Sequence, residues 1–277
     1  MPYQAEISRT NPTCFLFLVD QSGSMANRWG GEAGKTKAEG VADAINRLVQ
    51  TLVYRCAKGE YILDRYHIGV IGYGADIGLG FTGELSGGVL QPVSAIGNHP
   101  LRIEERVRRM DDGAGGLIEQ VVKFPVWFEP LAAGKTPMCT ALQAACDVIR
   151  GFVIQYSYCF PPIVMNITDG MATDGHPAQT AAELCNLASH DGGVLLLNLH
   201  ISERGESPLL FPVDETYLPD DFARMLFRMS SLLPPPMLHQ ARVQEAEVTE
   251  GARGFAFNAD LISVIRFLDI GTRIDRY

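Results

Sequence analysis

The sequence contains no cysteine pair in a C-x-x-C spacing and has little charge, and each of these features excludes a class of protein. Six cysteines are scattered through 277 residues. Most lie inside apolar stretches, which favours reduced core thiols over disulfides or a zinc site. Only 20% of the residues are charged, and the formal net charge is −9. We therefore expect no nucleic-acid partner, because that affinity comes mainly from clustered lysines and arginines.

Long hydrophobic runs are also absent. No run approaches the roughly 18 apolar residues that would suggest a membrane-spanning helix, and the opening sequence MPYQAEISRTNP lacks the basic start and apolar core of a secretory signal. We therefore expect a cytoplasmic protein with no membrane partner. Hydrophobic residues make up 47% of the chain, which is ample for one large core. Because no linker-like composition or repeat divides the chain, we expect a single domain over residues 1–277.

Short apolar runs alternate with amphipathic segments along this chain. The runs have the length of strands buried on both faces and lie at residues 14–19, 67–73, 162–168, 193–201 and 254–258. Apolar residues at helical spacing occupy residues 37–55, a segment opening at Pro137, and residues 177–189. This alternation predicts an α/β fold with a doubly wound, mainly parallel sheet and helices on both faces. With an edge strand near residues 121–128, we expect six strands.

Two regions interrupt the alternation. Residues 76–130 indicate an insertion that ends in the predicted edge strand. Its arginine-rich stretch LRIEERVRRMDD is diluted by acidic residues, which is typical of a solvated face. Residues 203–240 indicate a variable segment, in which a helix at residues 219–233 is followed by three prolines as a rigid stop.

Hydroxyl and carboxyl side chains gather in three of the predicted loops. Asp20, Ser22 and Ser24 alternate directly after the first strand, and Asp169 directly follows the strand at 162–168. Thr136 precedes a predicted helix, so we place it at the N-cap. Each piece alone is ordinary turn or cap chemistry. Because ligands of doubly wound sheets bind at the carboxyl ends of the strands, the set predicts a site for a hard cation.

Together these residues resemble the metal-ion-dependent adhesion site of von Willebrand factor A domains. That site has D-x-S-x-S after the first strand, a threonine before a helix, and an aspartate after the fourth core strand. The pattern is complete here as Asp20, Ser22, Ser24, Thr136 and Asp169. Within the family, NPTCFLFLVDQSGSM and GARGFAFNADLISVIRFLDIG look most similar to the TerY-like proteins of bacterial tellurium-resistance and stress gene clusters. The family resemblance also implies that the edge strand is antiparallel.

The resemblance implies a magnesium ion held directly by Ser22, Ser24 and Thr136, with Asp20 and Asp169 reaching it through water. Mn²⁺ or Ca²⁺ can replace Mg²⁺ at such a site, because oxygen ligands discriminate weakly among hard ions. Mg²⁺ takes six oxygen ligands, so a position is left for an Asp or Glu of a partner protein. We therefore expect a metal-dependent adaptor of a bacterial stress or tellurium-resistance system, with the metal held on solvent-facing loops.

Catalytic motifs are incomplete in this sequence. The two AGKT segments, residues 33–36 and 133–136, lack the preceding glycine of a P-loop, and DQSGSM is not a G-x-S-x-G elbow. We therefore expect no enzymatic activity. A metal-dependent phosphoester hydrolase stays open as an alternative, and it would require a general base beside metal-bound water. The second alternative is a metal-independent scaffold that binds through residues 76–130 or 203–240.

Overall fold

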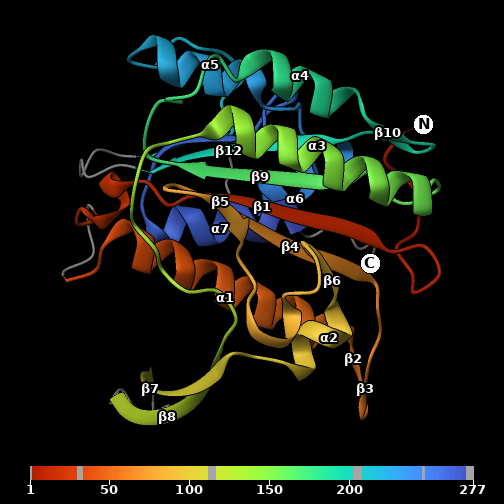
Figure 1. Cartoon of the computed structure of the whole chain (residues 1–277), viewed down its shortest axis with the longest axis vertical. Coiled ribbons are helices and arrows are strands. Elements are labelled where there is room, and N and C mark those ends of the chain that lie inside the picture. The colour runs from red at the N-terminus through yellow and green to blue at the C-terminus, as the bar shows by residue number, and fades with distance from the viewer. Residues whose placement is uncertain (1, 30–33, 112–116, 202–207, 245–246, 273–277) are drawn as a thin grey trace.

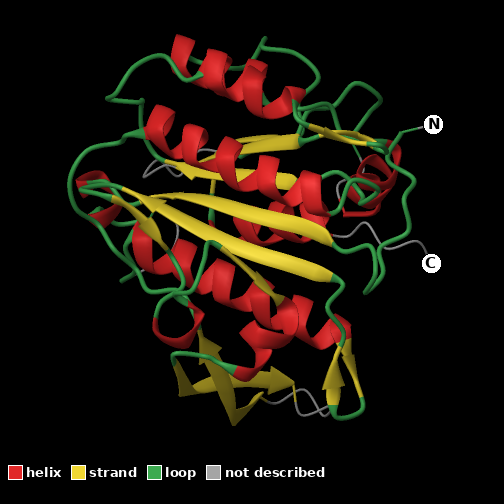
Figure 2. Ribbon diagram, turned by 45° about the vertical axis from the view of Figure 1, so that its right-hand side comes forward, coloured by secondary structure: helices red, strands yellow, loops and turns green. Residues whose placement is uncertain are grey.

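A central β-sheet with helices on both faces forms the body of the protein (Figures 1 and 2). The computed structural model describes residues 2–29, 34–111, 117–201, 208–244 and 247–272. Within these residues eight strands form the sheet, in the order β13-β14-β12-β9-β1-β4-β5, with β6 also paired to β4. Their bounds are β1 Thr13–Asp20, β4 Tyr66–Tyr73, β5 Ile77–Leu79, β6 Leu90–Pro92, β9 Ile163–Thr168, β12 Leu195–Ile201, β13 Leu209–Leu210 and β14 Phe255–Ala259.

The predicted doubly wound and mainly parallel sheet is confirmed. The five apolar runs correspond to β14, β12, β9, β1 and β4, which pair in parallel with one another. The predicted number of six strands is wrong, because β5, β6 and β13 add three short antiparallel edge strands. Each of the three has only two or three residues, which is too short to give a recognisable apolar run.

The antiparallel edge strand predicted at residues 121–128 is misplaced. Most of this segment belongs to β8 (Leu117–Val126), which pairs along its whole length with β7 (Arg102–Asp111) in a separate two-stranded hairpin. The hairpin forms because an equally long partner strand lies close by in sequence, so pairing closes only a short loop. Phe128, beyond the end of β8, forms an isolated antiparallel bridge with Phe81, which follows β5.

Seven α-helices lie within the described residues, four on one face of the sheet and three on the other (Figure 2). The first group is α1 Lys37–Cys56, α2 Val93–Asn98, α6 Pro235–Gln244 and α7 Leu261–Thr272, and the second is α3 Met138–Gln155, α4 Ala178–Asn186 and α5 Asp221–Met229. None of the described helices combines the length and apolar character needed to cross a membrane. The shorter elements are η1 Gly23–Ala26, η2 Gly83–Leu85, β2 Ala57–Lys58, β3 Tyr61–Ile62, β10 Ala188–Ser189 and β11 Gly192–Gly193.

The alternation of side chains in β1 explains why its sequence is continuously apolar. Phe15, Phe17 and Val19 pack in the layer that contains α1, α6 and α7. Cys14, Leu16 and Leu18 point to the opposite layer, with α3, α4 and α5. Every residue of the strand is buried, as expected of a parallel strand covered on both faces. All six cysteines of the chain are free thiols, and four of them are buried.

The start of α1 follows from a local sequence signal, whereas two other predicted helix boundaries differ from the structure. Thr36 caps α1 through a capping box, in which its hydroxyl accepts the Glu39 N–H and the Glu39 carboxylate accepts the Thr36 N–H. The predicted helix at 177–189 ends at Asn186. The helix expected at 219–233 ends at Met229, so the three prolines do not stop it. They open α6 instead, because proline fits the first turn of a helix.

The hairpin of β7 and β8 projects from the body of the protein beside α1 (Figure 1). Its root is attached by Asn46 of α1, whose amide donates to the Phe128 carbonyl at 2.8 Å and accepts the N–H groups of Trp127 and Phe128. Residues 101–103, 105 and 107 of the arginine-rich stretch are exposed, as expected of a solvated face, whereas Arg106 is half-buried, with its guanidinium 3.6 Å from the centroid of the Phe124 ring and bonded to Asp43. Residues 112–116 of the predicted insertion and 203–207 of the variable segment lie outside the described residues.

Candidate metal centre

The predicted site lies between β1 and β9, where the order in which the chain adds strands to the sheet reverses. From β1 the chain crosses to β4 on one side, whereas from β9 it continues to β12 and β14 on the other. β1 and β9 are adjacent parallel strands, paired up to Val19 and Ile167. Asp20 is the last residue of β1, and Asp169 directly follows β9, so both carboxylates stand at the switch point. Ligands of doubly wound sheets bind at this position.

Asp20 is completely buried at the base of the site. One of its carboxylate oxygens accepts the Ser22 N–H and the other accepts the Thr168 hydroxyl, both at 2.8 Å. Burial raises the pKa of Asp20 from 3.8 to about 6, while these hydrogen bonds oppose the rise and the nearby Asp169 carboxylate adds to it. Asp20 and Ser22 are both buried, whereas Gly23 and Ser24 of the same loop are exposed, so the loop faces solvent only beyond its first residues.

A row of hydrogen-bonded oxygens joins the first loop to the end of β9. The hydroxyls of Ser22 and Ser24 lie 3.0 Å apart, and the Ser24 hydroxyl donates to the Asp169 carboxylate at 2.8 Å. The alternate spacing of the two serines therefore places both hydroxyls on the same side of the loop. Four of the five predicted ligands, Asp20, Ser22, Ser24 and Asp169, are thus brought together through direct contacts or adjacent backbone.

Thr136 occupies a neighbouring loop, but it is not the N-cap of α3. The cap position is Pro137, and the first-turn N–H groups of Cys139 and Thr140 donate to the carboxylate of Asp174. Asp174 is therefore a residue that the sequence reasoning missed. The hydroxyl of Thr136 makes no hydrogen bond to any residue that the structure describes, although the residue itself is only 6% exposed.

Backbone hydrogen bonds hold the Thr136 loop against the first loop. The Gly23 N–H donates to the Gly134 carbonyl at 3.1 Å, and the Ala133 N–H donates to the Gln21 carbonyl at 2.6 Å. Gly134 has a φ of +84°, and a Cβ at this position would clash with the backbone of Ala75. Only glycine permits this close approach of three loops. The loops that contain Gln21, Ala75 and Gly134 therefore form one framework at the site.

Lys37 is a further charged residue at the site that the sequence reasoning missed. It is the first residue of α1, and its ammonium lies 2.8 Å from the Asp169 carboxylate oxygen that Ser24 does not use. The side chains of Lys37 and Asp169 are only 5% and 0% exposed. Since the two residues are 132 positions apart, no local sequence pattern marks the pair.

His200, near the end of β12, lies within electrostatic range of Asp169. Its ring stacks on Phe257 with centroids 4.6 Å apart, and its Nδ1 accepts the Asn258 N–H at 3.4 Å. Burial lowers the pKa of His200 to about 4. The imidazole is therefore neutral at physiological pH and stacked on Phe257.

The chemistry of the donors fits a hard cation. The site brings together two carboxylates, from Asp20 and Asp169, and two hydroxyls, from Ser22 and Ser24, and Thr136 lies on the neighbouring loop. Hard ions such as Mg²⁺ prefer oxygen ligands of these kinds. Among the described residues, no three His, Cys, Asp or Glu side chains come together as a metal site of the thiolate or imidazole type. The candidate site therefore differs from thiolate and imidazole sites, because hydroxyl oxygens are among its ligands.

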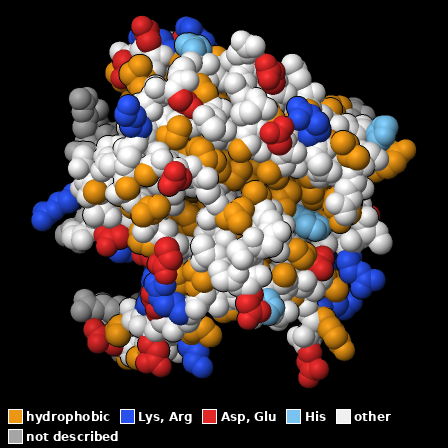
Figure 3. All heavy atoms as spheres, in the orientation of Figure 1, with side chains coloured by type: hydrophobic (Ala, Val, Ile, Leu, Met, Phe, Trp, Pro, Cys, Tyr) orange, Lys and Arg blue, Asp and Glu red, His pale blue; other side chains and the backbone are white. Residues whose placement is uncertain are grey.

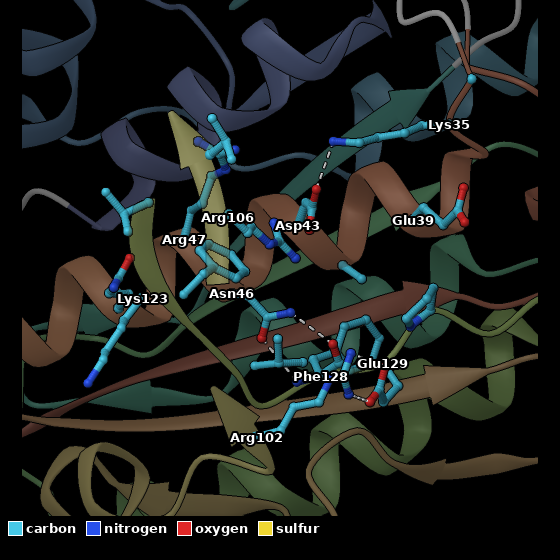
Figure 4. A pocket seen from close by; sticks show the side chains of 18 of the residues that line it. Lys35, Glu39, Asp43, Asn46, Arg47, Arg102, Arg106, Lys123, Phe128 and Glu129 are labelled. Carbon is cyan, nitrogen blue, oxygen red and sulfur yellow. Dashed lines mark hydrogen bonds and ion pairs between the residues drawn. The ribbon is translucent and has the colours of Figure 1, made fainter. Parts of the chain in front are cut away.

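A separate groove of about 830 Å³ lies between α1 and the β7–β8 hairpin (Figure 4). Asp43 bonds to both Lys35 and Arg106, and Arg102 forms an ion pair with Glu129. Charged side chains of both signs gather over the hairpin on the surface shown in Figure 3. This groove is lined by α1 and by the predicted insertion and is separate from the oxygen-rich site.

No protein-family model and no curated protein matches the sequence. Among solved structures, the chain is similar to the pilus adhesin SpaC from Lactobacillus rhamnosus GG, with 14% identity over 94% of this chain and 30% of that one and a TM-score of 0.49. It is also similar to the manganese-loaded TRAP protein of Plasmodium vivax, with 13% identity, coverage of 94% and 72%, and a TM-score of 0.45.

A third similar structure is the vWF domain of the pilus tip protein Mfa5 from Porphyromonas gingivalis. The identity is 15% over 58% of this chain and 38% of that one, with a TM-score of 0.32. The chain thus spans less than half the length of the SpaC and Mfa5 chains. At these identities and TM-scores, the similarities establish neither a family nor a ligand for this chain.

Proposed function

We propose that this protein is a metal-dependent interaction module of the von Willebrand factor A type, which captures an acidic side chain of another protein. The observation that carries the proposal is the row of oxygens from Ser22 through Ser24 to Asp169 at the switch point of the sheet. The Thr136 hydroxyl, without a hydrogen bond to any described residue, supplies a further donor.

Each site residue has a role in this proposal. The hydroxyls of Ser22, Ser24 and Thr136 would hold a magnesium ion directly, while Asp20 and Asp169 would orient those hydroxyls and bound water. When bound, the ion supplies a Lewis-acidic position that accepts a carboxylate oxygen. The protein's own contribution is a framework of three loops that keeps the hydroxyls in place before the ion arrives. Mn²⁺ or Ca²⁺ would occupy the same oxygens.

We also propose that the protein is not itself a catalyst. A general base has to reach the proton that it removes. Both oxygens of Asp20 and both oxygens of Asp169 already accept hydrogen bonds from the protein, and His200 is stacked on Phe257. A phosphoester hydrolase would be recognised by Mg²⁺-dependent turnover in a phosphatase and nucleotidase screen, lost in the Asp20→Asn variant.

The setting of the module belongs to the proposal as well. The segments around the first strand and the C-terminal helix resemble bacterial TerY-like proteins, so we place the protein in the cytoplasm, in a stress or tellurium-resistance system. Fractionation of the native host with an antibody to this chain tests the location. Recovery from the cell surface would contradict it.

Metal titration tests the proposed module most directly. Isothermal titration should show one Mg²⁺ site in the wild type and its loss in Ser22→Ala and Ser24→Ala. Ser86→Ala, an exposed serine outside the site, is the matched control and should bind as the wild type does. Capture of a partner from the native host should then require Mg²⁺ and fail in EDTA. Equal metal binding by the wild type and both site variants would refute the metal site.

The groove beside the hairpin supports a second candidate function, a scaffold that binds an acidic segment without metal. Arg47 and Lys123 line this groove, and neither lies within ion-pair distance of a carboxylate among the described residues (Figure 4). The chain as a whole carries a net charge of −9, so two cations in one groove that form no ion pair with a described carboxylate are a local exception, with Glu105 as the cross-strand neighbour of Lys123. Phe124, stacked under Arg106, provides an apolar floor.

Peptide binding in EDTA separates this scaffold from the metal-dependent module. A fluorescein-labelled hexaglutamate peptide should show raised anisotropy with the wild type. The charge reversals Arg47→Glu and Lys123→Glu should abolish it, while Lys58→Glu, on the exposed strand β2 outside the groove, should leave it unchanged. Binding that falls equally in all three variants would mean a nonspecific charge effect and would exclude the groove.

A further inference from the structure

Lys37 is held rigidly at the candidate metal centre by its place in α1. It directly follows the capping residue Thr36, and its backbone N–H donates to the Asn27 carbonyl at 3.0 Å. The side chain then reaches the Asp169 carboxylate at 2.8 Å in a pair that is almost fully buried. Holding a lysine in this position gives the site a fixed positive charge.

Asp169 can keep its ion pair with Lys37 when the other site residues bind a metal ion. Its two oxygens have separate duties, because one accepts the Ser24 hydroxyl and the other accepts the Lys37 ammonium. The ammonium therefore does not occupy the oxygen that faces the row of hydroxyls. Lys37 would therefore leave the other oxygen of Asp169 available to help hold a cation with Ser24.

The ammonium changes the net charge that an ion and its ligand experience. Asp20 and Asp169, when ionised, carry two negative charges, and Lys37 cancels one of them. A divalent ion would then leave the site with a net positive charge, whereas the same site without Lys37 would become neutral. Charge repulsion lowers the affinity for the ion, and the residual positive charge favours an incoming anion.

We infer that Lys37 sets the anion preference of this site, weakening metal binding while strengthening capture of a carboxylate by the occupied site. This inference rests on the proposed metal-dependent function and names the residue that regulates it. A neighbouring unit charge changes the proton affinity of a carboxylate by about 10- to 1000-fold. We expect Lys37 to change the affinity for a divalent ion by at least about tenfold, for the same electrostatic reason.

Two neutral variants and two controls test the inference. Lys37→Gln and Lys37→Met remove the charge, and Gln retains the ability to donate a hydrogen bond. Lys37→Arg keeps the charge. Lys35→Met is the matched control. Lys35 lies two residues before Lys37 and forms an ion pair of the same length, but with Asp43 and away from the site oxygens.

Titration with MgCl₂ should give at least about tenfold tighter binding in both neutral variants than in the wild type, with Lys37→Arg and Lys35→Met close to the wild type. N-acetylglutamate, titrated onto each Mg²⁺-saturated protein and followed by NMR, should bind several-fold more weakly to the neutral variants. Unchanged metal affinity in both neutral variants would overturn the inference, and so would equal tightening in Lys35→Met.

Folding of the variants gives a second readout. Without metal, the neutral variants leave the buried Asp169 carboxylate uncompensated, so their melting temperatures should fall and then recover more on Mg²⁺ addition than that of the wild type. Variants that stay unfolded even with Mg²⁺ would make Lys37 a purely structural residue and refute the inference. If neither the wild type nor any variant binds Mg²⁺, it is the proposed function that fails.

Discussion

Asp20→Asn should stabilise the metal-free protein at neutral and alkaline pH while leaving its stability near pH 4 almost unchanged. Asp20 is fully buried, and its pKa rises from 3.8 to about 6 on folding. Folding therefore favours the protonated carboxyl. The corresponding stability is fully present below pH 3.8 and is lost as the pH rises through about 6. A difference of about two pH units corresponds to roughly 3 kcal/mol lost by the wild type at pH 8.

Asparagine can replace this aspartate without breaking its hydrogen bonds. The amide oxygen takes the place of the carboxylate oxygen that accepts the Ser22 N–H. The amide NH₂ then faces Thr168 and donates to its hydroxyl, whose own hydrogen is left for the Gly170 carbonyl at 3.0 Å. Because size and hydrogen bonding are kept, the variant isolates the effect of the charge.

Urea unfolding in EDTA between pH 4 and pH 8 measures this effect. The difference in unfolding free energy between Asp20→Asn and the wild type should grow from near zero to about 3 kcal/mol as the pH rises. The buried His200 titrates in both proteins and cancels in the difference. Asp147→Asn is the matched control, because it makes the same substitution at an exposed aspartate on α3. A difference that is constant with pH, or a less stable variant at pH 8, would refute the reasoning.

The remaining predictions concern single contacts. Thr136→Ala should lower the free energy of unfolding by about 1 kcal/mol, because it removes a buried methyl group but no hydrogen bond of the hydroxyl, and it should weaken Mg²⁺ binding in a calorimetric titration. Asp174→Ala should lower stability by about 0.5–2 kcal/mol in urea unfolding, since it removes the cap of α3. Asn46→Ala should lower it by about 3 kcal/mol, because buried backbone groups at the hairpin root lose their partners. A thermal melt that Asn46→Ala leaves unchanged would contradict that attachment.

The five parallel strands were predictable because a strand buried on both faces leaves an uninterrupted apolar run in the sequence. β1 is the clearest example, with every residue buried. The edge strands were not predictable in the same way. β5 and β6 have only three residues each, and their pairing with β4 depends on where the preceding chain places them. The hairpin was missed because the charges of β7 suggested a solvated face rather than a strand.

At the candidate site, sequence spacing identified residues whose positions follow from one loop. Asp20, Ser22 and Ser24 share a loop directly after a strand, so their proximity follows from the backbone alone. Contacts between distant segments do not follow from spacing. Asp174 caps a helix that begins 36 residues earlier, at Met138, and Lys37 reaches Asp169 only because α1 and β9 are folded onto the same edge. Such contacts require the three-dimensional arrangement of the sheet.

Groups of the protein already donate hydrogen bonds to both carboxylates of this site. These contacts determine what a bound metal would add. Asp20 accepts a backbone N–H and a hydroxyl, and Asp169 accepts a hydroxyl and an ammonium. Burying a carboxylate without such partners is strongly unfavourable. Since the partners are present, the folded loops do not depend on an ion for their stability. A metal bound to this framework would therefore add charge to a site that is already ordered. Little of its binding free energy would then be lost to ordering the loops, and its charge would attract an anionic ligand.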